Sequence, residues 1–185
     1  MNADPSAYQV VMGAAFADLP DPVRAFHSGR GPHRWVGTAS IRRGGGILAR
    51  MAAAILRFPL PGEAVPVTVT VEPHGAGEIW IRDFGGHVLR STQWAEVDRG
   101  EPLLFERFGP VCVATALVLD AGRLELVQRR AWCLGLLMPR WLPTFGEAFE
   151  TQGGGSFCFD VTIRAPVIGL VVAYRGHLNE APAPD

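Results

Sequence analysis

The chain has 185 residues, of which 48% are hydrophobic and 19% charged, and its formal net charge at pH 7 is -1. A chain of this size buries enough surface to form one hydrophobic core, which excludes a disordered or collagen-like protein. Its three cysteines have no CxxC spacing, so they supply neither a zinc site nor a disulfide framework and indicate a reducing compartment.

The first residues carry no recognisable targeting signal. They include Asp4 and lack the basic region of a signal peptide, and no apolar run approaches the ~18 residues that cross a bilayer. We therefore expect a cytoplasmic protein. We expect residues 1–18 to be an N-terminal segment able to form a short helix, residues 19–178 a single β-rich domain, and residues 179–185 a flexible tail.

Two short helices are predicted before the first strand. Residues 7–16 are apolar and rich in alanine, and Asp21 followed by Pro22 is typical of a helix start. Residues 34–42 then alternate as a strand, which the three glycines from Gly44 to Gly46 end.

A third helix is predicted over residues 47–58. Ile47, Leu48, Met51 and Ile55 recur at helical spacing, and Arg50 and Arg57 are the only polar residues of the segment. A helix that is apolar nearly all round has to be covered on most sides, so we expect it to pack on the sheet. An aspartate at position 55 would then be strongly destabilising.

From residue 62 onward the pattern changes to a period of two. Val65, Val67, Val69 and Val71 alternate with other residues as in a strand, and glycine-containing turns separate the segments that follow. Further strands are predicted at 78–84, 87–94, 103–108, 111–119, 123–134, 147–152, 156–164 and 168–178. The fold class is therefore mainly β, an antiparallel curved sheet or calycin-like barrel of about ten strands with one or two N-terminal helices.

The charges are unevenly distributed. Between Pro22 and Gly62 there are seven arginines and no acidic residue, whereas the remainder of the chain is net acidic. Arg42, Arg43 and Gly45 lie where a strand turns into a helix, an arrangement that can bind an anion. The segment either pairs with acidic parts of the same fold or faces outward toward an anionic ligand or membrane. Nucleic acid is not expected, because the overall charge is not basic.

Motifs of known catalytic sites are missing. The sequence contains no GxSxG, HExxH, Walker A lysine or strand-helix GxGxxG, and its five histidines are isolated. We therefore assign no catalytic residues, no metal site and no cofactor, and we favour a protein that is not an enzyme. His27 at a helix end is either a buried hydrogen-bonding residue or a ligand contact.

Several arginines and aromatic residues are candidates for ligand contacts. Trp80, Arg82 and Phe84 share one face of a strand, so Arg82 is either a polar contact inside an apolar pocket or an arginine stacked on the surface. Arg107 and Tyr174 are further candidates. The apolar, proline-containing loop 134–143, which includes Trp141, is either a lid at the mouth of the pocket or an exposed patch.

Motifs along the chain resemble a known family. They include Trp80-x-Arg82-x-Phe84-Gly85, the stretch 106–110, the stretch 132–143 and Tyr174-Arg175-Gly176-x-Leu178. In order and spacing these are similar to the bacterial domain of unknown function 4166 over residues 19–178. The resemblance implies an accessory or binding role, because such domains occur alone or behind a nicotinamide-binding domain of the saccharopine-dehydrogenase-like type. It supplies no catalytic residues to transfer.

Three functions remain open at the level of the sequence. The first is binding of a small apolar or amphipathic, lipid-like molecule, for which we name Arg82, Arg107, Trp141, Tyr174 and His27 as ligand contacts. The second is a docking module for a partner such as a nicotinamide-dependent oxidoreductase. The third is an enzyme without a cofactor. An empty cavity favours binding, a packed interior with an exposed apolar patch favours docking, and a carboxylate beside His27 or His177 favours catalysis.

Overall fold

The computed structural model describes residues 5–28, 32–139, 146–166 and 168–182. Short helices precede the first strand, one helix follows it, and strands make up most of the remainder. The elements in chain order are α1 (Ala7–Met12), the 3-10 helix η1 (Gly13–Asp18), α2 (Asp21–Phe26), β1 (His33–Arg43), α3 (Ile47–Ile55), β2 (Gly62–His74), β3 (Gly77–Phe84), β4 (His87–Asp98), β5 (Glu101–Phe108), β6 (Val111–Asp120), β7 (Arg123–Cys133), β8 (Leu136–Leu137), β9 (Ala148–Gly153), β10 (Ser156–Ala165) and β11 (Gly169–Glu180).

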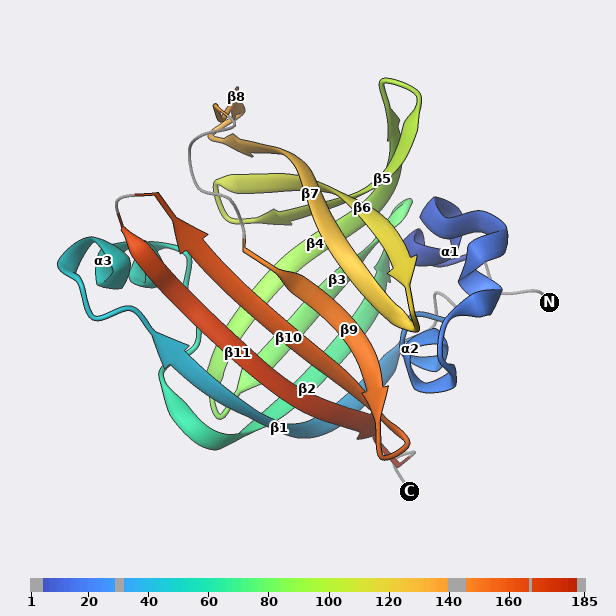
Figure 1. Ribbon diagram of the computed structural model, residues 1–185, viewed down its shortest axis with the longest axis horizontal. Coiled ribbons are helices and arrows are strands. Elements are labelled where there is room, and N and C mark those ends of the chain that lie inside the picture. The colour runs from blue at the N-terminus through green and yellow to red at the C-terminus, as the bar shows by residue number, and fades with distance from the viewer. Residues whose placement is uncertain (1–4, 29–31, 140–145, 167, 183–185) are drawn as a thin grey trace.

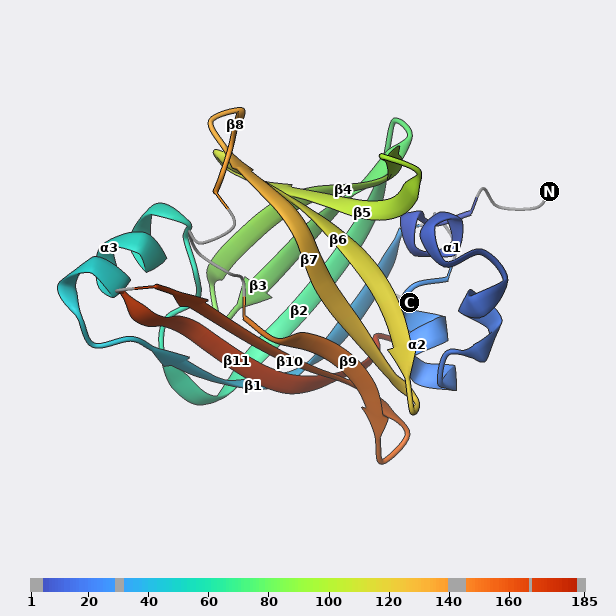
Figure 2. The same cartoon turned by 45° about the horizontal axis from the view of Figure 1, so that its top comes forward.

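Ten of the described strands form a closed antiparallel barrel, which confirms the predicted fold class. The order around the wall is β6-β5-β4-β3-β2-β1-β11-β10-β9-β7, and β7 returns to pair with β6 (Figures 1 and 2). The short strand β8 pairs antiparallel with the last two residues of β7. Closure pairs the last strands of the wall with each other, which reduces the strand edge that is open to edge-to-edge aggregation.

Side chains alternate between the inside and the outside of the barrel wall. In β2, Val67, Val69 and Val71 are buried, whereas Thr68 and Thr70 between them are only half-buried. The valines belong to the same buried cluster as core residues of β1, β10 and β11. The period-two pattern of the sequence is thus the pattern of an inner and an outer face.

The number of residue pairs between adjacent strands differs around the barrel wall. Nine residue pairs join β1 to β11, whereas among the described residues two pairs join β7 to β9, namely Leu124 with Glu150 and Glu125 with Phe149. The guanidinium carbon of Arg123 also lies 3.6 Å from the centre of the Phe149 ring. The β7–β9 contact is therefore the shortest pairing that closes the wall.

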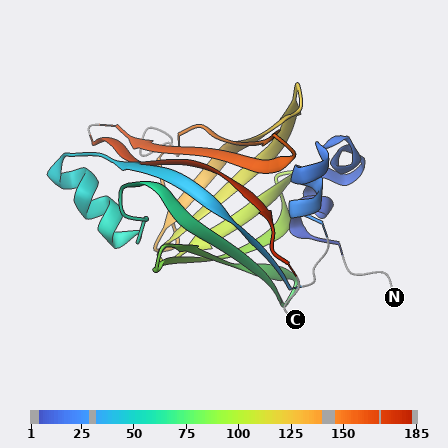
Figure 3. The same cartoon turned by 90° about the horizontal axis from the view of Figure 1, so that it is seen from below.

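Helices α1 and α2 close one end of the barrel (Figure 3). Ser6 caps α1, because its hydroxyl accepts a hydrogen bond from the Gln9 amide while the Gln9 side chain accepts one from the Ser6 amide. The same hydroxyl donates to the His27 carbonyl at 2.6 Å and so ties α1 to the end of α2. Tyr8 and Phe26 are buried and line the barrel interior.

Helix α3 lies at the opposite end of the barrel, and its surroundings differ from the prediction (Figures 1 and 3). It packs beside β11 and β1 through Ala49 and Ala53, which are 1% and 0% exposed. Ile47 and Ile55 are 75% and 66% exposed. The expectation that this helix is covered on most sides is therefore wrong. Its alanine face allows a close backbone approach, which leaves the larger side chains outside.

Candidate ligand-binding cavity

The barrel interior contains a cavity whose walls are mainly apolar. About 160 Å³ of it can be reached by the centre of a water molecule. Most of the lining comes from inward-facing positions of strands around the barrel, with additions from α1, α2 and the segment after α3. The apolar lining residues include Phe26, Phe58, Val67, Val69, Phe84, Leu89, Val113, Leu126, Phe157, Phe159, Val161 and Ile163.

Three polar side chains on neighbouring strands form a hydrogen-bonded cluster at the cavity wall. Arg82 donates to the Ser91 hydroxyl at 2.8 Å and to the Glu106 carboxylate at 3.0 Å, and Ser91 donates to Glu106 at 2.6 Å. Burial lowers the pKa of Arg82, but its neighbours, Glu106 first among them, outweigh that effect and raise the pKa. The guanidinium also lies 4.9 Å from the centre of the Trp80 ring. Arg82 is thus a fixed cation that Glu106 already neutralises.

A second polar group lies toward the end closed by the helices. The His27 Nε2 atom is 2.6 Å from the Glu150 Oε2 atom, and the His27 ring stacks on Tyr8 with 3.6 Å between ring centres. The His27 side chain is fully buried, whereas Glu150 lines the cavity and is 12% exposed. Among the described residues His27 Nδ1 has no hydrogen-bond partner.

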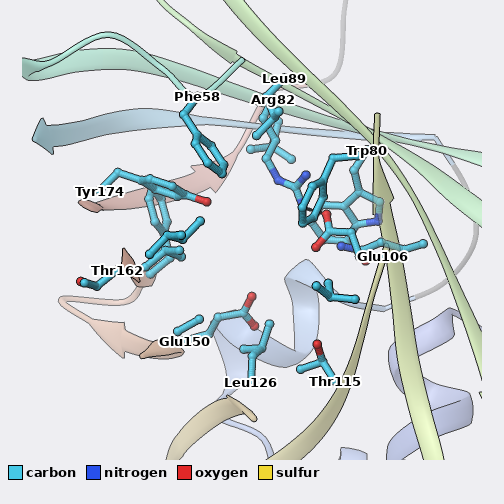
Figure 4. A pocket seen from close by; sticks show the side chains of 18 of the residues that line it. Phe58, Trp80, Arg82, Leu89, Glu106, Thr115, Leu126, Glu150, Thr162 and Tyr174 are labelled. Carbon is cyan, nitrogen blue, oxygen red and sulfur yellow. Dashed lines mark hydrogen bonds and ion pairs between the residues drawn. The ribbon is translucent and has the colours of Figure 1, made fainter. Parts of the chain in front are cut away.

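Further polar atoms face the same space. Figure 4 shows the Tyr174 hydroxyl and the Glu150 carboxylate pointing into the cavity from β11 and β9, two strands that are separated in the wall by β10. The Oε1 atom of Gln93, which also lines the cavity, has no hydrogen-bond partner among the described residues. Burial raises the pKa of Tyr174 to about 12, which keeps this hydroxyl a donor. The cavity therefore offers both donors and acceptors to a bound molecule.

The structure brings only some of the predicted ligand contacts together. Arg82 and Tyr174 line the cavity, and His27 lies behind Glu150. Arg107 lies elsewhere, with its guanidinium 5.8 Å from the centre of the Trp94 ring, in a shallow groove outside this cavity. Trp141 lies outside the described residues.

The predicted lid can be followed only in part. Leu136 and Leu137 are 76% and 56% exposed, while Met138 packs against the buried cluster of Val111, Val113 and Ala131. Residues 140–145 of this loop lie outside the described part of the chain.

The predicted anion site is not assembled as one group. Arg43 donates to the carbonyl oxygens of Phe58 and Pro59, so its guanidinium ties the end of α3 to β1. Arg42 and Gly45 are exposed. Within the described part of the chain, no side chain caps the N-terminus of α3.

Sequence reasoning did not identify Tyr8, Glu106 and Glu150 as cavity residues. Glu106 follows the strand period, because it lies between Leu104 and Phe108 on the inward face of β5. That alternation is the signal that could have found it. No comparable signal links Glu150 to His27, which is 123 positions away in the sequence.

Two kinds of feature are absent from the described residues. No described helix is long and apolar enough to cross a membrane. Within the same part of the chain, no three or more His, Cys, Asp or Glu side chains are grouped so that they could hold a metal ion.

Comparison with known proteins identifies a family. A family model described as a domain of unknown function (DUF4166) matches residues 19–178, which is most of the chain. No curated protein and no solved structure matches the chain. The match begins after α1 and η1 and includes the strands of the barrel wall except the last two residues of β11.

Proposed function

The chain belongs to the DUF4166 family, whose description assigns no function, and we propose that its barrel binds a small amphipathic, lipid-like molecule in the interior cavity. The observation that carries this proposal is an apolar interior cavity into which the polar ends of Tyr174 and Glu150 project. Concave apolar sites with a few convergent polar groups are typical of small-molecule binding. A docking module would need no such space inside its barrel.

The polar groups restrict the chemical class of the ligand. Glu106 already neutralises Arg82, so an anionic headgroup would gain little from Arg82 and would be repelled by Glu150 and Glu106. A hydroxyl or amine group of the ligand could donate a hydrogen bond to the Glu150 carboxylate. A ligand hydroxyl could also accept a hydrogen bond from the Tyr174 hydroxyl, and an amine could lie beside it. We therefore propose an apolar body against the phenylalanine and valine wall and a polar end that carries hydrogen-bond donors.

Native mass spectrometry of protein purified from its own host tests this proposal directly. A retained small molecule with an apolar body is the expected result. Binding of a neutral hydrophobic fluorescent probe provides a second readout. The Thr115→Phe variant narrows the cavity and should bind the probe about tenfold more weakly, whereas Thr68→Phe on the outer face of β2 serves as the matched control.

The proposal is overturned if both variants bind as wild type does, or if no probe and no retained molecule are found. Tyr174→Phe tests the polar contact alone, because it removes one hydroxyl and keeps the ring. We expect about fivefold weaker binding of a retained ligand that carries a donor, as befits one lost hydrogen bond.

The Glu150–His27 pair favours a second candidate function, acid–base catalysis in the same cavity. A carboxylate at a cavity wall with its second oxygen held by a buried histidine can accept a proton from a bound molecule. Incubating the retained ligand with wild type and with Glu150→Gln separates the two functions. Conversion by wild type alone supports catalysis, whereas unchanged ligand in both samples supports a binding protein.

A further inference from the structure

Helix α3 turns its large apolar side chains away from the protein. Ile47, Leu48, Met51 and Ile55 are 75%, 57%, 55% and 66% exposed. At the α-helical rotation per residue these four lie within an arc of roughly 100°. The alanines on the opposite face make the contact with the barrel, so the usual polarity of a surface helix is inverted.

The apolar face is flanked by cations. Arg42, Arg50 and Arg57 are exposed just before, within and just after α3. No acidic residue occurs from Pro22 to Gly62, so the helix and its flanks carry no carboxylate. Arg43 is excluded from this set, because the carbonyl oxygens of Phe58 and Pro59 already bind its guanidinium.

The helix is also followed by residues that contact the barrel interior at this end. Leu56, which follows α3, packs against the Val111, Val113 and Ala131 cluster, and Phe58 lines the cavity. Met138 packs against the same cluster, just after the exposed Leu136 and Leu137. Two exposed apolar segments therefore occur at the barrel end opposite α1 and α2 (Figures 1 and 3).

We propose that α3 docks this end of the barrel onto a lipid surface that contains anionic headgroups. Ile47, Leu48, Met51 and Ile55 enter the acyl region, and Arg50 and Arg57 contact the headgroups. A second copy of the chain fits less well, because a two-fold contact between α3 faces would bring the arginines of both copies together. The inference goes beyond the proposed ligand binding and does not depend on it.

Co-sedimentation of the full chain with vesicles tests the docking. We compare phosphatidylcholine vesicles with vesicles of phosphatidylcholine and phosphatidylglycerol, each at low and high salt. Binding to the mixed vesicles, weakened by salt and by the absence of phosphatidylglycerol, is expected. Arg50→Gln should lower the partition coefficient about fivefold.

A pair of double variants tests the apolar face. Leu48→Gln with Met51→Gln alters α3, and Val10→Gln with Val97→Gln alters exposed apolar residues on α1 and β4 as the control. All four positions are exposed, so both proteins should fold, which a thermal melt verifies. The α3 variant should lose vesicle binding while the control keeps it.

Equal sedimentation of the two double variants, or no sedimentation of wild type, overturns the proposal. So does a dimer in sedimentation equilibrium that the α3 variant abolishes, since the occupant of this face would then be a second copy. Vesicle binding with an empty cavity would leave the docking intact and reject only the ligand.

Discussion

Tyr8 and Tyr174 are the two tyrosines of the chain, and both lie inside the barrel. Tyr8 contributes to the closed end and stacks on His27, whereas Tyr174 points its hydroxyl into the cavity. Burial raises the pKa of Tyr8 well above 10.0, with nearby Glu150 and Glu106 adding to the effect, and raises the pKa of Tyr174 to about 12.

These shifts predict how the protein behaves in alkali. Above pH 10 an unfolded tyrosine ionises while the folded ones stay protonated. The stability that is fully present below pH 10 is therefore lost as the pH rises toward and through 12. Near-ultraviolet absorbance should show no phenolate at pH 10 and a cooperative rise on alkaline unfolding. A gradual rise centred at pH 10 in folded protein would contradict this.

At the scale of the element, α3 shows that composition does not determine which face of a helix is covered. Every face of residues 47–56 is apolar except at Arg50, so the sequence pattern could not distinguish an alanine contact from an isoleucine contact. In the structure, the buried Ala49 and Ala53 form the face of the helix that is covered.

A matched pair of substitutions checks this placement. Ala53→Asp puts a charge at a fully buried position and should reduce the free energy of unfolding by about 3 kcal/mol or more. Ile55→Asp, two residues later at a position that is 66% exposed, should change it by less than about 0.5 kcal/mol. Chemical denaturation measures both, and similar losses would show that the helix packs through its larger residues.

The order of the strands could be read from the sequence because local chemistry sets it. Turns such as Gly85–Gly86 and Gly154–Gly155 need positive φ angles, which glycine adopts without strain, and each joins two strands of alternating pattern. Predicted strand 111–119 and observed β6 (Val111–Asp120) differ by one residue.

Contacts between distant segments could not be read in the same way. The β7–β9 closure and the His27–Glu150 contact depend on the twist and curvature of the whole wall. These contacts decide which polar residues meet in the cavity. The sequence therefore predicted the fold more completely than the site.

At the scale of the molecule, α1 helps to close one end of the barrel. This helix precedes the region that the family model matches. Tyr8 fills the end of the barrel, where it stacks on His27 and lies 6.2 Å from Trp80, between ring centres. Tyr8→Ala should reduce the free energy of unfolding by about 3–5 kcal/mol, as for other buried aromatic residues.

The hole left by Tyr8→Ala should bind phenol. Phenol should then raise the melting temperature of this variant and leave that of wild type unchanged. Val10→Ala on the same helix is the control, because Val10 is 54% exposed. If phenol stabilises all three proteins equally, Tyr8 does not fill the end of the barrel.

The β7–β9 contact, which we call the seam and which has two residue pairs among the described residues, should make local opening of the barrel wall uneven. Amide hydrogens exchange with solvent through local openings, and few backbone pairs mean a low opening free energy. Deuterium uptake should be faster in β7 and β9 than in β1 and β11, and faster still in Arg123→Ala, which removes the stack on Phe149. Since Glu150 belongs to the seam, each opening would move its carboxylate away from His27 and part the wall beside the cavity. A molecule bound as we propose could then enter and leave through the side of the wall, at a rate set by the opening of the β7–β9 contact.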